Sequence, residues 1–195
     1  MITYPAHRIP YRVLGIDPGS ATLGVAVLDL YLDDLSIDLA DARTFNAGRG
    51  MQDYQQTELY HGPRMARLQF MADHLAGYLS QMHPDGLASE SPYMGRFVTV
   101  FRALTECLLV IHQVGYHYDP RRVLHLIDPM AVKAAVGVVA KGYRNKAALA
   151  KEHVRRGVLA LPLGNPNGVD MSALDEHSID AIAVAMARIK QMTQP

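Results

Sequence analysis

The chain has one cysteine, no net charge and no long uninterrupted apolar run, and each of these absences argues against a class of protein. The single cysteine, Cys107, cannot form an internal disulfide and favours a reducing, cytoplasmic compartment. Because the apolar runs are short or broken by charge, we expect no membrane span, which needs about 20 predominantly apolar residues. The first residues lack the apolar core of a secretion signal, so we expect none.

The content of the chain is typical of one folded domain. It has 195 residues, of which 49% are hydrophobic and 19% are charged, which is the balance of a globular protein. No internal repeat, low-complexity tract or linker divides it. We therefore expect a single domain over residues 1–195, with its core over about 11–192.

The neutral total hides a segregation of charge along the chain. The segment from Arg121 to Arg156 contains nine basic and two acidic residues, whereas the segment from Asp29 to Glu58 contains seven acidic and two basic residues. A chain of this kind can present a basic face to phosphates while remaining neutral overall. The alternative is scattered, solvated charge.

The order of strand and helix patterns predicts an α/β fold, with a mixed central sheet flanked by helices. The first three strands follow one another through tight turns and are therefore expected to be antiparallel. The helices are expected from apolar residues recurring at steps of three and four, and Asp128-Pro129 is typical of a helix N-cap. The expected elements are strands at 11–17, 23–30, 36–45, 87–90 and 123–127, helices at 62–82, 96–114, 144–156 and 174–192, and surface loops at 46–60 and 161–169.

Two of the expected strands end on a carboxylate. Asp17 follows an apolar strand and precedes a glycine-bearing turn, and Glu90 ends the short strand at 87–90. Burying an unpaired carboxylate is costly, so two acids at the ends of central strands indicate a shared cation. A structural turn aspartate is the alternative for Asp17.

The last helix carries a third group of polar residues. His177 and Asp180 are three residues apart and share a helix face, and Asp180 lies beside the apolar stripe that enters the core. Asp175 is better suited to the first turn, where it complements the helix dipole. A surface His–Asp pair is the alternative.

Oxygen ligands with few nitrogens suit Mg²⁺ or Mn²⁺ better than Zn²⁺. Asp17, Glu90, Asp180 and His177 could hold two such ions for in-line attack on a phosphodiester. His177 is either a ligand or a proton carrier, since its charge can change near neutral pH.

Four blocks of sequence resemble one known family. They are residues 13–20 (VLGIDPGS) with Gly24 after them, residues 88–93 (ASESPY), Val132-Lys133 with Gly137 and the run 141–146, and His177 with residues 180–185 (DAIAVA). In this order, from about residue 11 to 189, they resemble the RuvC family of Holliday junction resolvases, in the RNase H-like superfamily.

The resemblance implies a homodimeric, Mg²⁺-dependent endonuclease that nicks four-way DNA junctions symmetrically. It implies that Asp17 and Asp180 bind metal, as the corresponding family aspartates do. In the family the lysine-containing segment contacts DNA phosphates, and the helix corresponding to residues 96–114 lies at the dimer interface. The DNA-binding candidates are Tyr93, Arg96, Lys133, Lys141, Arg144 and Lys146.

The chain also departs from the family pattern. Tyr93 stands where many relatives place a phenylalanine wedge, and the acidic stretch from Asp29 to Glu58 is longer than in bacterial members. With the neutral net charge, these differences indicate a divergent, phage-type member. The alternatives are an RNase H-like nuclease on flaps, forks or RNA–DNA hybrids, an actin-like ATPase, for which the chain is short, and a junction-binding protein without catalysis.

Overall fold

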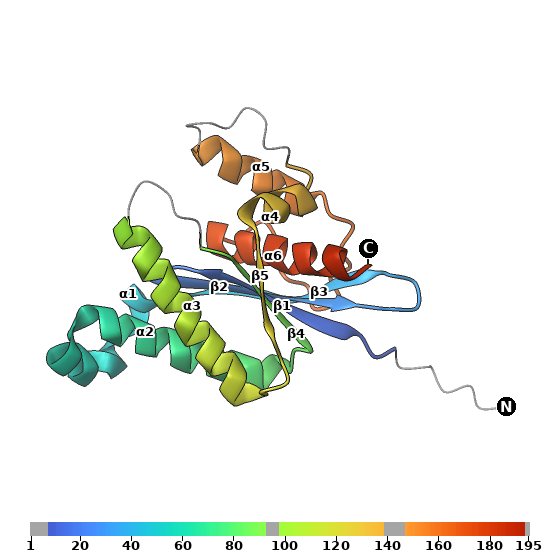
Figure 1. The fold of residues 1–195 in the computed structure, drawn as a ribbon. Helices are drawn as coiled ribbons and strands as arrows, with labels where there is room; N and C mark the ends of the chain where they lie inside the picture. The colour runs from blue at the N-terminus through green and yellow to red at the C-terminus, as the bar shows by residue number, and fades with distance from the viewer. Residues whose placement is uncertain (1–7, 93–97, 139–146, 194–195) are drawn as a thin grey trace.

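A five-stranded mixed sheet forms the centre of the computed structural model, which describes residues 8–92, 98–138 and 147–193 (Figure 1). Its spatial order is β3-β2-β1-β4-β5. β1, β2 and β3 pair antiparallel, and β4 and β5 run parallel to β1. This confirms the predicted mixed sheet with three antiparallel first strands. The strands are β1 (Tyr11–Pro18), β2 (Thr22–Leu30), β3 (Ile37–Asn46), β4 (Gly86–Glu90) and β5 (Leu124–Ile127).

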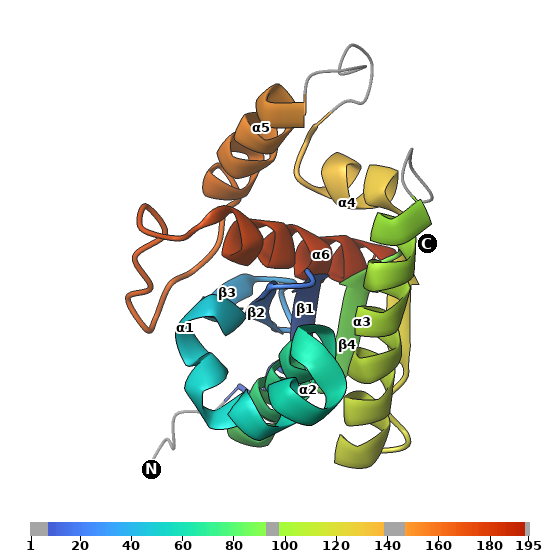
Figure 2. The same cartoon turned by 90° about the vertical axis from the view of Figure 1, so that its left-hand side faces the viewer.

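Helices cover both faces of the sheet, as Figure 2 shows with α6 lying directly on it. On one face, α4 (Pro129–Ala135), α5 (Ala147–Leu159) and α6 (Glu176–Thr193) enclose an apolar cluster with β1 and β2. On the other, α2 (Gln55–Met82) and α3 (Val98–Tyr118) enclose a second cluster. Because both faces are covered, β2 is buried along almost its whole length.

Asp128 caps α4 as predicted. Its side chain accepts a hydrogen bond from the Met130 N–H at 2.7 Å, and Pro129 is the first helical residue. The cap ties the end of β5 to the start of α4.

The prediction of a surface loop at 46–60 is wrong. The segment forms α1 (Ala47–Gly50), the short 3₁₀ helix η1 (Met51–Tyr54) and the first turns of α2. The Asn46 side chain caps α1 by accepting from the Gly48 N–H, and Ala47 and Tyr54 are buried in a small cluster with Ala66 and Phe70, while most other residues of the segment are exposed at the surface. The expected helix start at Gly62 is a kink inside α2, with φ 84° and ψ 165°.

The segment at 161–169 contains neither helix nor strand, as predicted, and it covers the outer edge of β3. The Leu39 N–H donates to the Gly164 carbonyl at 2.8 Å, and the Gly164 N–H donates to the Ile37 carbonyl at 2.9 Å. These bonds occupy backbone groups of an edge strand that would otherwise be open to another chain.

The expectation of no membrane-length helix needs one correction. α3 has 21 residues, and its most apolar 18-residue window has a mean hydropathy of 1.3, which is long and apolar enough for a span by length and composition alone. The core helix of a globular protein passes the same test, and Cys107, Leu108 and Ile111 of α3 are buried against the sheet. Within its most apolar window 22% is buried, so much of the rest of this helix is open at the surface.

Candidate active site

The structure places Asp17 and Glu90 on neighbouring strands at the same edge of the sheet. β1 and β4 are parallel, with Ile16 opposite Ser89, so the next residue of each strand is a carboxylate. Side chains at the carboxyl ends of adjacent parallel strands converge on one crevice. The two acids predicted from separate strand ends therefore belong to one site.

Two glycines allow α6 to lie directly on the sheet and bring its first turns to these acids. A Cβ on Gly15 would lie 2.1 Å from the Ala181 carbonyl oxygen, and one on Gly24 would lie 2.2 Å from the His177 carbonyl oxygen. Only a residue without a side chain permits such a close backbone approach. α6 thereby carries His177 and Asp180 over the ends of β1 and β2.

Asp175 fixes the first turn of α6 against β3. Its carboxylate accepts hydrogen bonds from the Ser178 N–H at 2.9 Å and from the Thr44 hydroxyl at 2.6 Å. These bonds lower its pKa against the opposing effect of burial. Asp175 was expected in the first turn; it instead directly precedes the first residue of α6, Glu176, and caps the helix.

The carboxylates of the site act on one another electrostatically. Burial and then the charge of Asp17 raise the pKa of Glu90 to about 7, with Lys133 acting in the opposite direction. Burial, then Asp17 and Glu90, raise the pKa of Asp180 to about 7. Desolvation and like charges both disfavour the ionised form, so a cation bound here would favour ionisation of these acids.

These shifts predict that the metal-free protein loses stability as pH rises from about 4 to 7. The unfolded carboxyls ionise near pH 4, but the folded ones keep their protons until about pH 7, so folding is penalised above that range. Glu90→Gln and Asp180→Asn should therefore each raise the unfolding free energy at pH 8 by roughly 2 to 4 kcal/mol, with little effect at pH 4.

Denaturant unfolding in EDTA at both pH values measures this effect. Glu58→Gln, at an exposed position in the first turn of α2, is the matched control and should change little. Equal stability of all three variants and the wild type at pH 8 would show that the buried carboxylates carry no such penalty.

His177 has a partner at each ring nitrogen. Nδ1 lies 2.8 Å from Asp17 Oδ2, and Nε2 lies 2.9 Å from the Thr22 hydroxyl. The hydrogen bond to Asp17 raises the pKa of His177, against the effect of burial. In this arrangement the imidazole orients the Asp17 carboxylate, and it would have to exchange a partner before a ring nitrogen could bind a metal.

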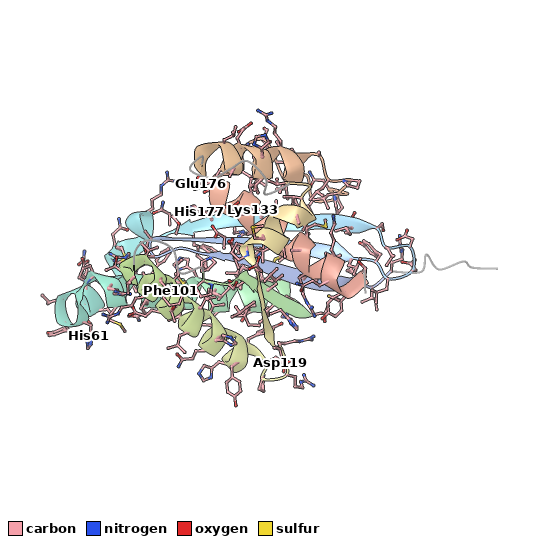
Figure 3. The ribbon with its side chains drawn as sticks, turned by 45° about the horizontal axis from the view of Figure 1, so that its top comes forward. His61, Phe101, Asp119, Lys133, Glu176 and His177 are labelled. Atoms are coloured by element: carbon pink, nitrogen blue, oxygen red, sulfur yellow. The ribbon has the colours of Figure 1, made fainter. Side chains whose placement is uncertain are left out.

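Two hollows meet at Glu90. One, of about 220 Å³, is lined by Glu90 and Asp180 together with Lys133 and Lys151. The other, of about 210 Å³, lies between Asp17, Glu90 and the buried side of α3. Figure 3 shows Lys133 on the same side of the molecule as Glu176 and His177, and far from His61 and Asp119.

Of the predicted DNA-binding residues, the structure places Lys133 in the site. Tyr93, Arg96, Lys141, Arg144 and Lys146 lie outside the described residues. Thr22, Lys151 and Glu176 were not expected at the site. Lys151 had a signal in the sequence only as one of the nine basic residues between Arg121 and Arg156.

The three carboxylates of the site suit a hard divalent cation, but their present arrangement does not form a complete set of ligands. Asp17, Glu90 and Asp180 supply carboxylate oxygens, the ligands preferred by Mg²⁺ and Mn²⁺, and burial and neighbouring carboxylates raise the pKa of Glu90 and of Asp180. Among the described residues, no group of three or more His, Cys, Asp or Glu side chains is already arranged to hold a metal. Binding would therefore require these side chains to move.

Comparison with known proteins gives the family. No family profile matches the chain. The crossover junction endodeoxyribonuclease RuvC of Chloroflexus aurantiacus is 30% identical over 129 residues, which cover 64% of this chain and 67% of the relative. This chain belongs to the RuvC family.

Solved structures of resolvases share the fold. Thermus thermophilus RuvC in complex with a Holliday junction substrate aligns with a TM-score of 0.66 and 18% identity, over 94% of this chain and 96% of that one. The yeast mitochondrial Holliday junction resolvase Ydc2 aligns with a TM-score of 0.63 and 12% identity, over 97% and 84%. The RNase H-like fold predicted from the sequence is confirmed.

Proposed function

We propose that this chain is a Holliday junction resolvase, a metal-dependent endonuclease that nicks four-way DNA junctions. The observation that carries the proposal is the convergence of Asp17, Glu90 and Asp180 at one edge of a RuvC-like sheet. A negative cluster gains nothing for binding DNA phosphate, so it indicates catalysis through cations. Relatives named crossover junction endodeoxyribonuclease, and a structural neighbour bound to a Holliday junction, support the substrate.

Asp17, Glu90 and Asp180 would hold two Mg²⁺ ions, for which Mn²⁺ would substitute. When bound, such ions lower the pKa of the attacking water and stabilise charge on the phosphate and the leaving 3′ oxygen. His177 keeps Asp17 oriented through Nδ1, while Thr22 occupies Nε2. Lys133 supplies a positive charge beside Glu90 for a phosphate entering the hollow.

We also propose a homodimer, formed through the side of the molecule that α2 and α3 cover. A groove of about 560 Å³ lies between these helices, and burying its apolar surface would favour association. The exposed apolar residues of these two helices are Leu59, Tyr60 and Met65 on α2 and Val98, Val100, Leu109 and Tyr116 on α3, and Met65 lines the groove.

A substrate panel tests the proposal. A mobile four-way junction, a fork, a flap, a linear duplex and an RNA–DNA hybrid are each incubated with Mg²⁺, Mn²⁺ or EDTA. We expect nicking of the four-way junction with either metal and none in EDTA. In competition, unlabelled junction should suppress the reaction far better than duplex at equal concentration, because the substrate preference lies in branched geometry.

Other outcomes point elsewhere. Preferred cutting of flaps, forks or hybrids would indicate a different RNase H-like nuclease with the same metal chemistry. Junction binding without cleavage under any metal would contradict an enzyme. A cruciform plasmid reports the dimer in the same experiment, because paired nicks linearise it, whereas an isolated subunit leaves a nicked circle.

A further inference from the structure

An ion pair joins α5 to the start of α6 at the entrance of the active site. Lys151 Nζ lies 2.6 Å from Glu176 Oε2, and about half of each side chain is exposed (54% and 52%). Glu176 is the first residue of α6 and directly precedes His177. The pair therefore links the Lys151 ammonium to the helix that carries two of the site residues.

Lys151 lies at both hollows that reach Asp180. In one it stands with Glu90 and Lys133; in the other, of about 300 Å³, it stands with Glu176. The charges of Asp180 and Asp17 favour its protonated form, after the larger effect of Glu176. The ammonium is thus already within the electrostatic field of the catalytic carboxylates.

Packing of α5 fixes the backbone position of Lys151, while its side chain can exchange Glu176 for another anion. Val154 and Val158, on the same face of α5, are buried in the core and fix the helix that carries it. An exposed ion pair adds little to stability, so the fold does not depend on this contact. A lysine is a compact charge on a flexible stem and can change partners without moving its helix.

We propose that Lys151 is a phosphate-binding residue of the active site and that Glu176 holds it there until DNA arrives. On binding, the ammonium passes from the Glu176 carboxylate to a non-bridging oxygen of a phosphate entering opposite Lys133. Glu176 therefore competes with the phosphate for the ammonium until DNA binds. This inference rests on the proposed function and adds one contact to it.

The test measures affinity for a four-way junction in EDTA, where no cleavage occurs, across a series of salt concentrations. The affinity falls as salt rises, and each phosphate contact makes the slope of log affinity against log salt steeper by about 0.9. Lys151→Met, which keeps the apolar stem, should therefore make the slope shallower by about one and weaken binding. Arg156→Met is the matched control on α5, since Arg156 pairs with Glu152 and lines neither hollow; its slope should equal that of the wild type.

A second variant tests the exchange itself. Glu176→Gln should strengthen binding about 2- to 5-fold, the range expected for an exposed ion pair, and the gain should vanish in the Lys151→Met background. Lys151→Arg should restore the slope. Thermal unfolding of all variants checks that the fold is intact. We expect unfolding temperatures close to that of the wild type, because both side chains are about half exposed.

The outcomes separate the two proposals. If the wild type neither binds nor cuts the junction, the proposed function fails. If the wild type does both, but Lys151→Met keeps the full salt slope and Glu176→Gln acts equally in both backgrounds, then the pair is only a surface ion pair and this inference alone is overturned.

Discussion

Asp17→Asn and Glu90→Gln should each lower junction cleavage by about 10²-fold or more, the cost expected when charge that stabilises the transition state is lost. Each replacement keeps the size of the side chain but removes the charge that would hold a cation at the shared end of β1 and β4. Junction binding should persist, because removing negative charge from a DNA-binding surface does not weaken phosphate contacts.

Single-turnover cleavage of an end-labelled junction, with binding measured on the same preparations, checks this result. Glu58→Gln on the first turn of α2 controls for the loss of one acid and should cut at the wild-type rate. Full cleavage by both site variants would remove these residues from the site.

Gly24→Ala should destabilise the protein by about 1–3 kcal/mol, the usual cost of forcing atoms into a packed core, and should also reduce cleavage. The new Cβ would meet the carbonyl oxygen of His177 at 2.2 Å and its carbonyl carbon at 2.6 Å. These are backbone atoms, so α6 itself must move, and His177 and Asp180 move with it. A displacement of about 1 Å can cost about 10²-fold in rate.

The same substitution at Gly77 should act in the opposite direction. Gly77 lies in α2 with nothing within 4 Å of its added Cβ, so Gly77→Ala should stabilise the helix by up to about 1 kcal/mol. Denaturant unfolding of Gly24→Ala and Gly77→Ala at one common pH measures both changes in stability. The difference between them reports the contact of α6 with β2. Equal stability of Gly24→Ala and the wild type would contradict the close backbone contact between α6 and β2.

The sequence was sufficient to predict the convergence of the carboxylates. Asp17 and Glu90 each end an apolar strand, which was enough to predict a shared cation, and the parallel pairing of β1 with β4 that brings these ends together was found in the structure. His177 and Asp180 lie three apart on a helix whose apolar stripe sets the orientation of their common face. These inferences depend only on local periodicity and on strand order.

Other features depend on contacts between distant segments and could not be read locally. The hydrogen bond of Thr22 to His177 spans 155 residues, and the ion pair of Lys151 with Glu176 spans 25. The helices within 46–60 were missed because few of their residues are apolar; Ala47 and Tyr54 are buried only because Ala66 and Phe70 of α2 pack on them. A short segment of this kind acquires its structure from tertiary packing rather than from its own pattern.

Crystals of the protein soaked in Mn²⁺ provide the most direct test of the central claim, because anomalous scattering locates the ions without reference to activity. We predict manganese peaks between Asp17, Glu90 and Asp180 in the wild type, and their loss in Asp17→Asn. Manganese bound elsewhere, with these three carboxylates left without an ion, would contradict the assignment of this site.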